Sequence, residues 1–286
     1  MTKVRIFAVS GKMILSRSEF QDRPWHATPP LDMVAALAVS SMLGPEESQL
    51  YHWVGRRAQG LGATVDLGAF AGGSAARLLS GLTLSGHRHH LHAYDFFTAT
   101  GKARARWVPD AKPDSNGVAD ILPHVMARLA PWQGQFTLHR GDIGQAKWSG
   151  DPIEILAVDA AKSTALTDHT ATQFYPALLP GQSVIMHQDF LHDILPWIPA
   201  QMVALRDCFE PLAKVENDCL VFMCHRVPSA MELQGARTNG LSDGDLCQRV
   251  LLAADWLKAM VPERRFEKMI HKIQANPGVR IGWKMK

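Results

Sequence analysis

Two hydrophobic patterns alternate along this chain. The first consists of short, nearly continuous apolar runs, which are typical of strands covered on both faces of a sheet. Such runs predict strands at 63–67, 91–94, 136–139, 153–158, 183–186, 213–216 and 219–225. The alternation of these strands with helix-like stretches predicts an α/β protein with a doubly wound, mostly parallel seven-stranded sheet.

The second pattern has apolar residues at every third or fourth position, as on one face of a helix. It predicts helices at 31–43, 45–59, from the turn after 67 to about 82, and at 119–129, 167–179, 194–210 and 243–273. The basic, proline-bearing segment 96–118 has neither pattern, and we expect a long loop that is a lid or a disordered insertion. These elements divide the chain into an N-terminal extension with helices (1–60), a core (61–228) and a C-terminal helical extension (229–286).

A glycine-rich turn follows the first strong strand, in the sequence Val65-Asp-Leu-Gly-Ala-Phe-Ala-Gly-Gly-Ser74. Glycines let backbone N–H groups approach a ligand, and the first turn of the next helix offers unpaired donors and a positive dipole. Doubly wound proteins hold nucleotide-like cofactors at such a loop. A plain strand-to-helix turn is the structural alternative.

Three kinds of glycine loop compete for this segment. A phosphate-binding P-loop requires a lysine at its end, and Gly73-Ser74-Ala75 has none. A dinucleotide loop requires G-x-G-x-x-G, whereas the glycines here are Gly68, Gly72 and Gly73. An acid, one apolar residue and then spaced glycines form the pattern of an S-adenosylmethionine loop, which this segment resembles closely.

Acidic residues stand at or just after five of the predicted strands. They are Asp66, Asp95, Asp142, Asp159 and Asp189. One such acid is readily explained as a turn former or a helix cap. Because the carboxyl ends of parallel strands share one edge of the sheet, five of them predict a single crevice lined by carboxylates.

Composition narrows the class of protein. The 286 residues are 47% hydrophobic and 20% charged, as in globular proteins, and the formal charge of +3 gives no support for binding to nucleic acid or a membrane surface. The four cysteines lack zinc-finger spacing, and the two at 219 and 224 fall in a strand-like run. The longest apolar stretch, 31–43, is too short to span a bilayer, and the first residues lack the apolar core of a signal peptide. We therefore expect a cytoplasmic protein.

At this point the chain resembles the class I S-adenosylmethionine-dependent methyltransferases, over roughly residues 31–226. Within them it is most similar to the branch of macrocin-type sugar O-methyltransferases and catechol O-methyltransferases. The resemblance is carried by the glycine loop, His92-Ala-Tyr-Asp95, Arg140-Gly-Asp142, Ala157-Val-Asp159 and Tyr175-Pro-Ala-Leu-Leu-Pro-Gly-Gln-Ser-Val-Ile185. It implies a Rossmann-like methyltransferase fold.

The resemblance also implies a set of cofactor-binding residues. The glycine loop would pack against the methionine part of the cofactor, Asp95 would bind the ribose hydroxyls and Asp142 the adenine amine. The full implied set is Asp66, Gly68, Ala69, Phe70, Gly72, Gly73, Ser74, Asp95, Phe96, Asp142, Ile143 and Asp159.

Metal-dependent relatives bind magnesium with an acid after the fourth strand and a pair after the fifth. The matching residues here are Asp159, Gln188 and Asp189. A neutral amide in the pair offers only its carbonyl oxygen, and Mg²⁺ prefers carboxylates and water. The pattern thus leaves open whether Mg²⁺ takes part.

His187 is the first candidate for the catalytic base, because it stands directly before Gln188 at a strand end. An imidazole with an ordinary pKa near 6.5 can accept a proton from a hydroxyl or amine at neutral pH. Asp159 and Lys162 complete the candidate catalytic set, with Lys162 orienting an anionic group. The alternative reading of His187 is a buried residue hydrogen-bonded to Asp159 or Asp189.

Other functions compete with methyl transfer. His187 and Asp189 also match part of the iron site of an Fe(II)/2-oxoglutarate oxygenase, with His225 as a distal ligand, although such sites sit on antiparallel scaffolds. Asp95 would suit a nicotinamide-dependent oxidoreductase, but the glycine spacing does not. A third alternative is a catalytically silent protein that binds the cofactor.

The sequence favours an enzyme, a methyltransferase that acts on the hydroxyl or amine of a small molecule, with a homo-oligomer as one possible assembly. We expect the first 30 residues and the segment 96–118 to cover the acceptor. Four residues in these segments, Trp25, Arg104, Arg106 and Trp107, suggest an anionic or ring-bearing acceptor.

Overall fold

All seven predicted strands lie in one sheet of a computed structural model, which describes residues 17–286. The strands are Ala63–Leu67 (β1), Leu91–Asp95 (β2), Phe136–Arg140 (β5), Ile153–Val158 (β6), Val184–His187 (β7), Phe209–Val215 (β8) and Cys219–Cys224 (β9). Their order is β5-β2-β1-β6-β7-β9-β8, and only the pairings of β9 with β7 and β8 are antiparallel. The predicted α/β class and mostly parallel sheet are confirmed. Expectations for residues 1–16 lie outside the described residues.

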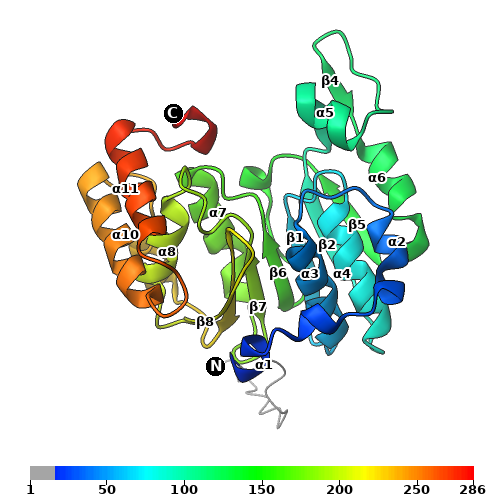
Figure 1. Cartoon of the computed structure of the whole chain (residues 1–286), viewed down its shortest axis with the longest axis horizontal. Helices are drawn as coiled ribbons and strands as arrows, with labels where there is room; N and C mark the ends of the chain where they lie inside the picture. The colour runs from blue at the N-terminus through cyan, green and yellow to red at the C-terminus, as the bar shows by residue number, and fades with distance from the viewer. Residues whose placement is uncertain (1–16) are drawn as a thin grey trace, which may run out of the picture.

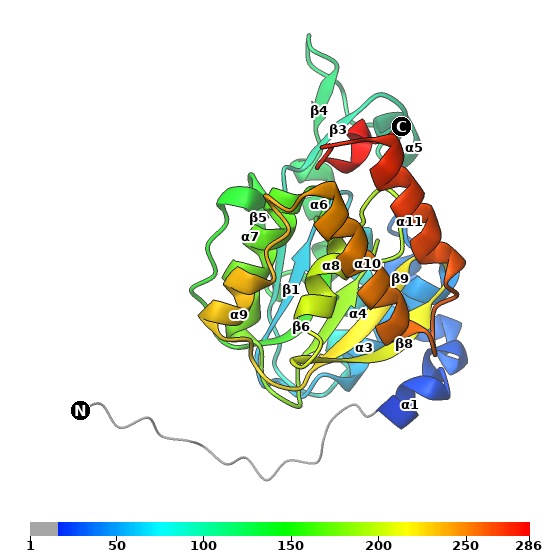
Figure 2. The same ribbon diagram turned by 90° about the vertical axis from the view of Figure 1, so that its left-hand side faces the viewer.

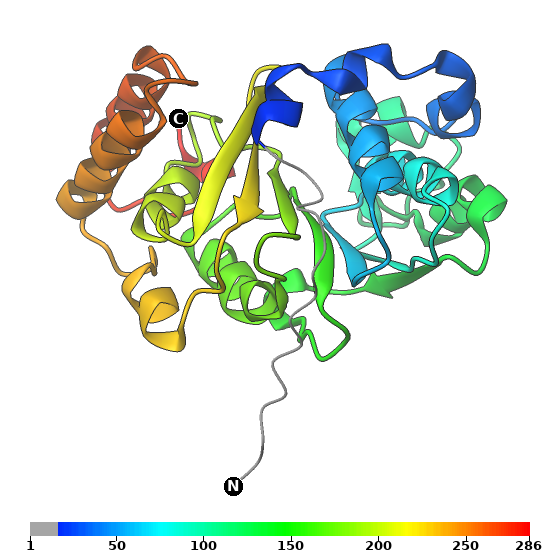
Figure 3. The same ribbon diagram turned by 90° about the horizontal axis from the view of Figure 1, so that it is seen from below.

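Helices cover both faces of this sheet (Figures 1 and 3). Pro45–Arg57 (α3) and Gly73–Leu84 (α4) pack on one face, where the core includes Leu50, Leu78 and Ile155. Thr164–Phe174 (α7), Trp197–Ala204 (α8), Asp243–Leu257 (α10) and Arg264–Ala275 (α11) pack on the other. The central strands β1 and β6 are buried along their whole length, which explains their continuous apolar runs.

Local sequence signals set where the helices begin. Pro45 takes the first position of α3, and the Glu47 carboxylate accepts the Gly44 N–H at 2.9 Å. The Ser163 hydroxyl caps α7 by accepting the Leu166 N–H at 3.2 Å. Such caps satisfy backbone donors that have no partner inside the helix.

Two predicted helices are shorter than expected. In the stretch 31–43, Pro30–Met33 (η2) and Val34–Leu37 (α2) form only short helical turns. The stretch 194–210 holds α8, but strand β8 already begins at Phe209. In the first stretch Leu31, Val34 and Leu37 are exposed, so the apolar spacing does not mark a buried helix face. In the second, the apolar residues of both α8 and the start of β8 are buried, so their spacing does not reveal where the helix ends.

The segment predicted as a long loop has its own structure. Thr98–Thr100 (β3) and Val118–Asp120 (β4) pair antiparallel, and Gly101–Trp107 (α5) lies between them. Figures 1 and 2 both show this arm projecting beyond the main sheet, on the same side as the C-terminus. Leu122–Arg128 (α6) follows it, so the helix expected at 119–129 starts later than predicted.

Short helices lie between the main elements along the chain and near both ends of its described part. They are Arg17–Gln21 (α1), Pro24–Ala27 (η1), Ala130–Trp132 (η3), Ile143–Gln145 (η4), Tyr175–Ala177 (η5), Ala230–Gly235 (α9) and Gly282–Lys284 (η6). The C-terminal segment returns to the sheet edge, where Ile281 pairs with Ser163. The division at residues 60 and 228 stays a prediction.

Two expectations from composition can be compared with the structure. Cys219 and Cys224 are free thiols buried in β9. Within residues 17–286, none of the helices has the length and apolar character needed to cross a membrane.

Candidate functional site

The glycine loop lies directly after β1, as predicted. Gly68 has a φ of +96°, and a Cβ at this position would lie 2.9 Å from the Asp159 carbonyl oxygen. A Cβ on Gly73, the first residue of α4, would lie 2.5 Å from the Ser41 hydroxyl oxygen. These two positions therefore need glycine for close packing against the neighbouring strand end and the segment before α3.

Asp95, the last residue of β2, ties the glycine loop to the next strand. One carboxylate oxygen accepts the Phe70 N–H at 3.1 Å, and the other accepts the Phe97 N–H at 2.7 Å. Burial raises the pKa of Asp95, while these two hydrogen bonds act in the opposite direction. The acid is thus held in a fixed orientation beside the loop, and its oxygens retain lone pairs for further donors.

Asp66 does not lie at the rim of the crevice. It is inside β1 and only 1% exposed, and its carboxylate accepts the Ser74 hydroxyl at 2.7 Å. Burial raises the pKa of Asp66 to about 7, although the bond from Ser74 lowers it. Asp66 therefore supports the first turn of α4 from below, which corrects its expected place at the crevice.

A cavity of about 240 Å³ opens in front of the glycine loop. Its walls come from the loop itself, from the ends of β6 and β7, from the segment before α3 and from the arm. The lining residues are Ser40, Ser41, Met42, Leu43, Gly68, Ala69, Phe70, Ala71, Gly73, Ser74, Trp107, Asp159, Lys162, Gln188 and Asp189. Most of the predicted loop residues therefore share one cavity with the three predicted metal ligands, Asp159, Gln188 and Asp189.

Lys162 joins the two carboxylates of this cavity. Its ammonium donates to Asp159 Oδ1 at 2.6 Å and also to Asp189 Oδ2. Burial disfavours the charged lysine, but the two carboxylates outweigh it and raise the pKa of Lys162. Lys162 is therefore an ammonium ion at neutral pH, a donor and not a base.

Asp159 experiences opposing influences on its ionisation. Burial raises its pKa, Lys162 lowers it and the nearby Asp189 raises it again. The net direction is upward. A carboxylate with a raised pKa is a better proton acceptor near neutral pH than an ordinary aspartate.

Gln188, the third predicted metal ligand, is turned toward α3. Its Oε1 accepts the Tyr51 hydroxyl at 3.1 Å, and it also hydrogen-bonds to the buried Glu47. Burial raises the pKa of Glu47 to about 7. The amide thus has partners within the protein.

The predicted magnesium set can be tested on this donor geometry. A divalent cation would lie between Asp159 and Asp189, where the Lys162 ammonium lies, and the oxygen of Gln188 already has a donor. Among residues 17–286, no cluster of three or more acidic, histidine or cysteine side chains is arranged to hold a metal ion. These residues do not fit a magnesium ion, and we derive no step through one.

His187 does not face the cavity. It is the last residue of β7 and 1% exposed, and its Nε2 lies 3.0 Å from the Tyr175 hydroxyl oxygen. Its Nδ1 has no partner among the described residues, and burial lowers its pKa to about 3. This corrects the expectation of a base in the crevice, and equally the alternative of a bond to Asp159 or Asp189. It also argues against the competing iron site at His187 and Asp189, because the His187 ring does not face the cavity that Asp189 lines.

Asp142 and Ile143 follow the end of β5, the strand next to β2, whose last residue is Asp95. Asp142 is exposed and caps η4 by accepting the Gly144 N–H at 2.8 Å, and Phe96 is 56% exposed nearby. Asp142 and Phe96 both line a cavity of about 680 Å³. The residues predicted for the adenine end thus lie along the same sheet edge as the glycine loop.

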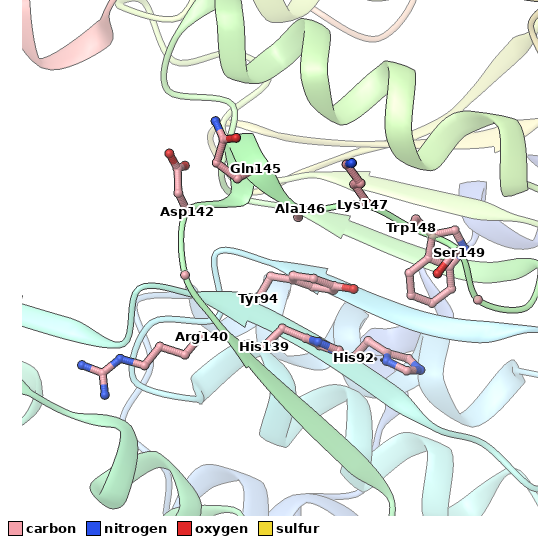
Figure 4. A pocket seen from close by; sticks show the side chains of 12 residues that line it. His92, Tyr94, His139, Arg140, Asp142, Gln145, Ala146, Lys147, Trp148 and Ser149 are labelled. Atoms are coloured by element: carbon pink, nitrogen blue, oxygen red, sulfur yellow. Dashed lines mark hydrogen bonds between the residues drawn. The ribbon is translucent and has the colours of Figure 1, made fainter.

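A further pocket of about 500 Å³ starts at Asp142 and runs along the face of β2 and β5 (Figure 4). The Tyr94 and His139 rings stack there with centroids 4.2 Å apart, and the His92 ring stacks on His139 at 5.2 Å. His92 therefore lies in a strand, as predicted from the run 91–94, and takes part in this ring stack.

Some site residues were not predicted from the sequence. Arg77 is buried in α4, and its guanidinium donates to the carbonyl oxygens of Val39 at 2.7 Å and Gly73 at 3.1 Å. It therefore fastens the segment before α3, with its cavity-lining residues 40–43, to the glycine loop. A cation in an otherwise apolar helix was the available signal.

Of the residues expected to cover the acceptor, some lie at the cavity and others have partners elsewhere in the protein. Trp107 lines the cavity, as expected of the arm, and the Arg106 guanidinium lies 4.6 Å from its ring centroid. Arg104 instead donates within the arm, to the Ala111 carbonyl oxygen at 2.9 Å. Trp25 is fully buried against Phe20, so the expectation that Trp25 contacts the acceptor is wrong.

Comparison with known proteins identifies the fold. No family model and no curated protein sequence matches this chain. Among solved structures, the O-methyltransferase NovP is similar over 65% of this chain and 82% of its own, with 16% identity and a TM-score of 0.51. An SAH-bound methyltransferase from Podospora anserina, PaMTH1, is similar over 73% of this chain and 87% of its own, with 11% identity and a TM-score of 0.43, too low to support an argument. The similarity to NovP shows that the chain has a methyltransferase fold.

Proposed function

We propose that this protein is a class I S-adenosylmethionine-dependent methyltransferase that acts on a hydroxyl group of a small molecule. The observation that carries the proposal is the hydrogen bond between Asp95 and Phe70, a glycine-loop residue that lines the same cavity as Asp159, Lys162 and Asp189. This arrangement lies at the carboxyl edge of a sheet with a methyltransferase fold, where doubly wound proteins bind nucleotide-like ligands.

The site has groups suited to each part of the cofactor. The backbone from Gly68 to Ser74, with the first turn of α4, suits the methionine part. The Asp95 carboxylate, already oriented by Phe70 and Phe97, suits the two ribose hydroxyls as donors. Phe96, Ile143 and Asp142 suit the face and the amine of the adenine.

The bound cofactor would supply a methyl group on a positively charged sulfur. The acceptor oxygen would take this methyl group with one of its lone pairs, and the electron pair of the C–S bond would remain on the sulfur. We assign the hydroxyl proton to Asp159, whose raised pKa makes it a better proton acceptor than an ordinary aspartate. Lys162 stays protonated and donates a hydrogen bond to the acceptor oxygen.

Positioning would make the largest contribution to the rate. Holding the oxygen and the methyl carbon in line replaces an encounter in solution and is worth roughly 7 kcal/mol or more in well-oriented systems. The small volume of the cavity, about 240 Å³, and the Trp107 ring in its wall support a small acceptor over a macromolecule.

Calorimetric titration with S-adenosylhomocysteine tests this function. We expect the wild-type protein to bind one equivalent, and Asp95→Ala to weaken the affinity by at least about 30-fold, because two charge-assisted hydrogen bonds and the orientation of Phe70 are lost. The matched control is Asp255→Ala, an exposed aspartate on α10 paired only with Lys258 at 2.9 Å. No saturable heat with the wild-type protein would refute the proposal.

A further inference from the structure

The cavity acids are held together by a side chain and not by a metal-ligand arrangement. Lys162 Nζ lies 2.6 Å from Asp159 Oδ1 and also contacts Asp189 Oδ2, and all three residues line the cavity. The side chain of Lys162 is 35% exposed and lines the cavity, so a ligand in the cavity can contact it.

The backbone around Lys162 is fixed from two sides, by β1 and by the C-terminal segment. The Asp159 N–H donates to the Leu67 carbonyl oxygen at 2.8 Å, which anchors the start of this turn to β1. The Lys162 carbonyl oxygen accepts the Gly282 N–H at 2.9 Å, and Ser163 pairs with Ile281 beside it. The C-terminal segment thus holds the lysine in place, and the ammonium position is a built feature of the fold.

Charge and space at this position both act against a divalent cation. The Lys162 ammonium already neutralises one of the two carboxylate charges, which leaves a single net negative charge. This single charge attracts a divalent cation less strongly than two free carboxylates would. A cation bound by both acids would have to approach within a few ångströms of the ammonium or displace it. Gln188 adds no ligand, because its carbonyl oxygen accepts the Tyr51 hydroxyl at 3.1 Å.

We propose that the Lys162 ammonium replaces a divalent cation in this site and binds the acceptor oxygen through its remaining N–H. This inference rests on the proposed function, since it assigns the acceptor-binding group of the same cavity. A lysine ammonium has three donors, and two point at Asp159 and Asp189. The third can bind one hydroxyl or carboxylate oxygen, so the acceptor is held by a single oxygen and not chelated as a vicinal diol would be by a metal.

The test measures binding of Mn²⁺ alone, followed by electron paramagnetic resonance, to the full-length protein and two variants. The wild-type protein should bind no Mn²⁺ at this site, and Lys162→Arg should behave in the same way because it keeps the positive charge. Lys162→Met removes the charge but keeps an unbranched side chain. It should leave the two carboxylates free to bind one Mn²⁺, at least tenfold more tightly than the wild-type protein and in competition with Mg²⁺.

Two results would overturn the inference. One is stoichiometric Mn²⁺ binding to the wild-type protein that is lost in Asp189→Asn. The other is a folded Lys162→Met variant, checked by circular dichroism, that binds no more Mn²⁺ than the wild-type protein; if this variant fails to fold, the wild-type result decides. Titration of the same samples with S-adenosylhomocysteine reports on the proposed function separately, because that ligand uses Asp95 and the glycine loop.

Discussion

At the scale of single residues, the position of an ionisable group relative to the strand end decides its chemistry. Asp66 and His187 lie within β1 and β7, where both are buried. Burial raises the pKa of Asp66 to about 7 and lowers that of His187 to about 3, so the imidazole is uncharged at neutral pH. Asp159 and Asp189 follow the ends of β6 and β7, and their side chains reach the cavity.

The raised pKa of Asp66 predicts a pH-dependent stability. Between its ordinary pKa of 3.8 and the folded value of about 7, the folded state keeps a proton that the unfolded state releases. The free energy of unfolding contributed by this group therefore falls as the pH rises through that window. Asp66→Asn stays neutral and can still accept the Ser74 hydroxyl, so it should lack this slope.

Urea denaturation at pH 5 and pH 8 measures the effect. From pH 5 to pH 8, the wild-type protein should lose roughly 2–3 kcal/mol more of its free energy of unfolding than Asp66→Asn does. Parallel pH profiles for the two proteins would contradict a buried, protonated Asp66.

His187 should matter for stability and not for cofactor binding. His187→Ala removes a buried ring that contacts Tyr175 and Phe190, which should lower the free energy of unfolding by about 2–4 kcal/mol. Its affinity for S-adenosylhomocysteine should stay within about twofold of the wild-type value, because the ring lies outside the cavity. Unchanged stability with lost turnover would restore His187 as a catalytic residue.

At the scale of elements, the loop between β1 and α4 requires glycine for two reasons, a positive φ and close packing. A comparison with a second glycine separates their effects. Gly68 has a positive φ and no room for a Cβ, which would lie 2.9 Å from the Asp159 carbonyl oxygen. Gly86 has a similar φ of +81°, but nothing lies within 4 Å of a Cβ there.

This pair gives a matched comparison of Gly68→Ala and Gly86→Ala. Both variants should lose about 1 kcal/mol of unfolding free energy from the backbone conformation alone. Gly68→Ala should lose more, and its affinity for S-adenosylhomocysteine should fall at least tenfold, because the loop must shift away from β6. Equal losses and equal affinities, measured by denaturation and calorimetry, would show that close packing at Gly68 has no role.

The sequence predicted some elements much better than others, for a physical reason. Strands β1 and β6 were predicted at their observed bounds, because continuous burial on both faces produces continuous apolar runs. The start of β8 at Phe209 was missed, because it continues an apolar stretch from α8. The β3–β4 arm was missed because its strands are short and partly exposed.

At the scale of the whole molecule, the predicted gathering of acids at one sheet edge is the feature that sequence could establish. Asp95, Asp142, Asp159 and Asp189 all lie at that edge, as parallel strands require. What sequence could not establish is which side chains pair there. The contact of Lys162 with Asp189, 27 positions away, and the closure by the C-terminal segment at Gly282 depend on the folded chain.

Hydrogen exchange, measured by mass spectrometry with and without S-adenosylhomocysteine, tests the central claim most directly, because it locates the binding site in the intact chain. We predict slower exchange in the loop 68–74 and in the segments 95–97 and 142–145, with no change in α10. Unchanged exchange in the glycine loop under saturating ligand, or protection confined to a distant element, would contradict a cofactor site at this edge of the sheet.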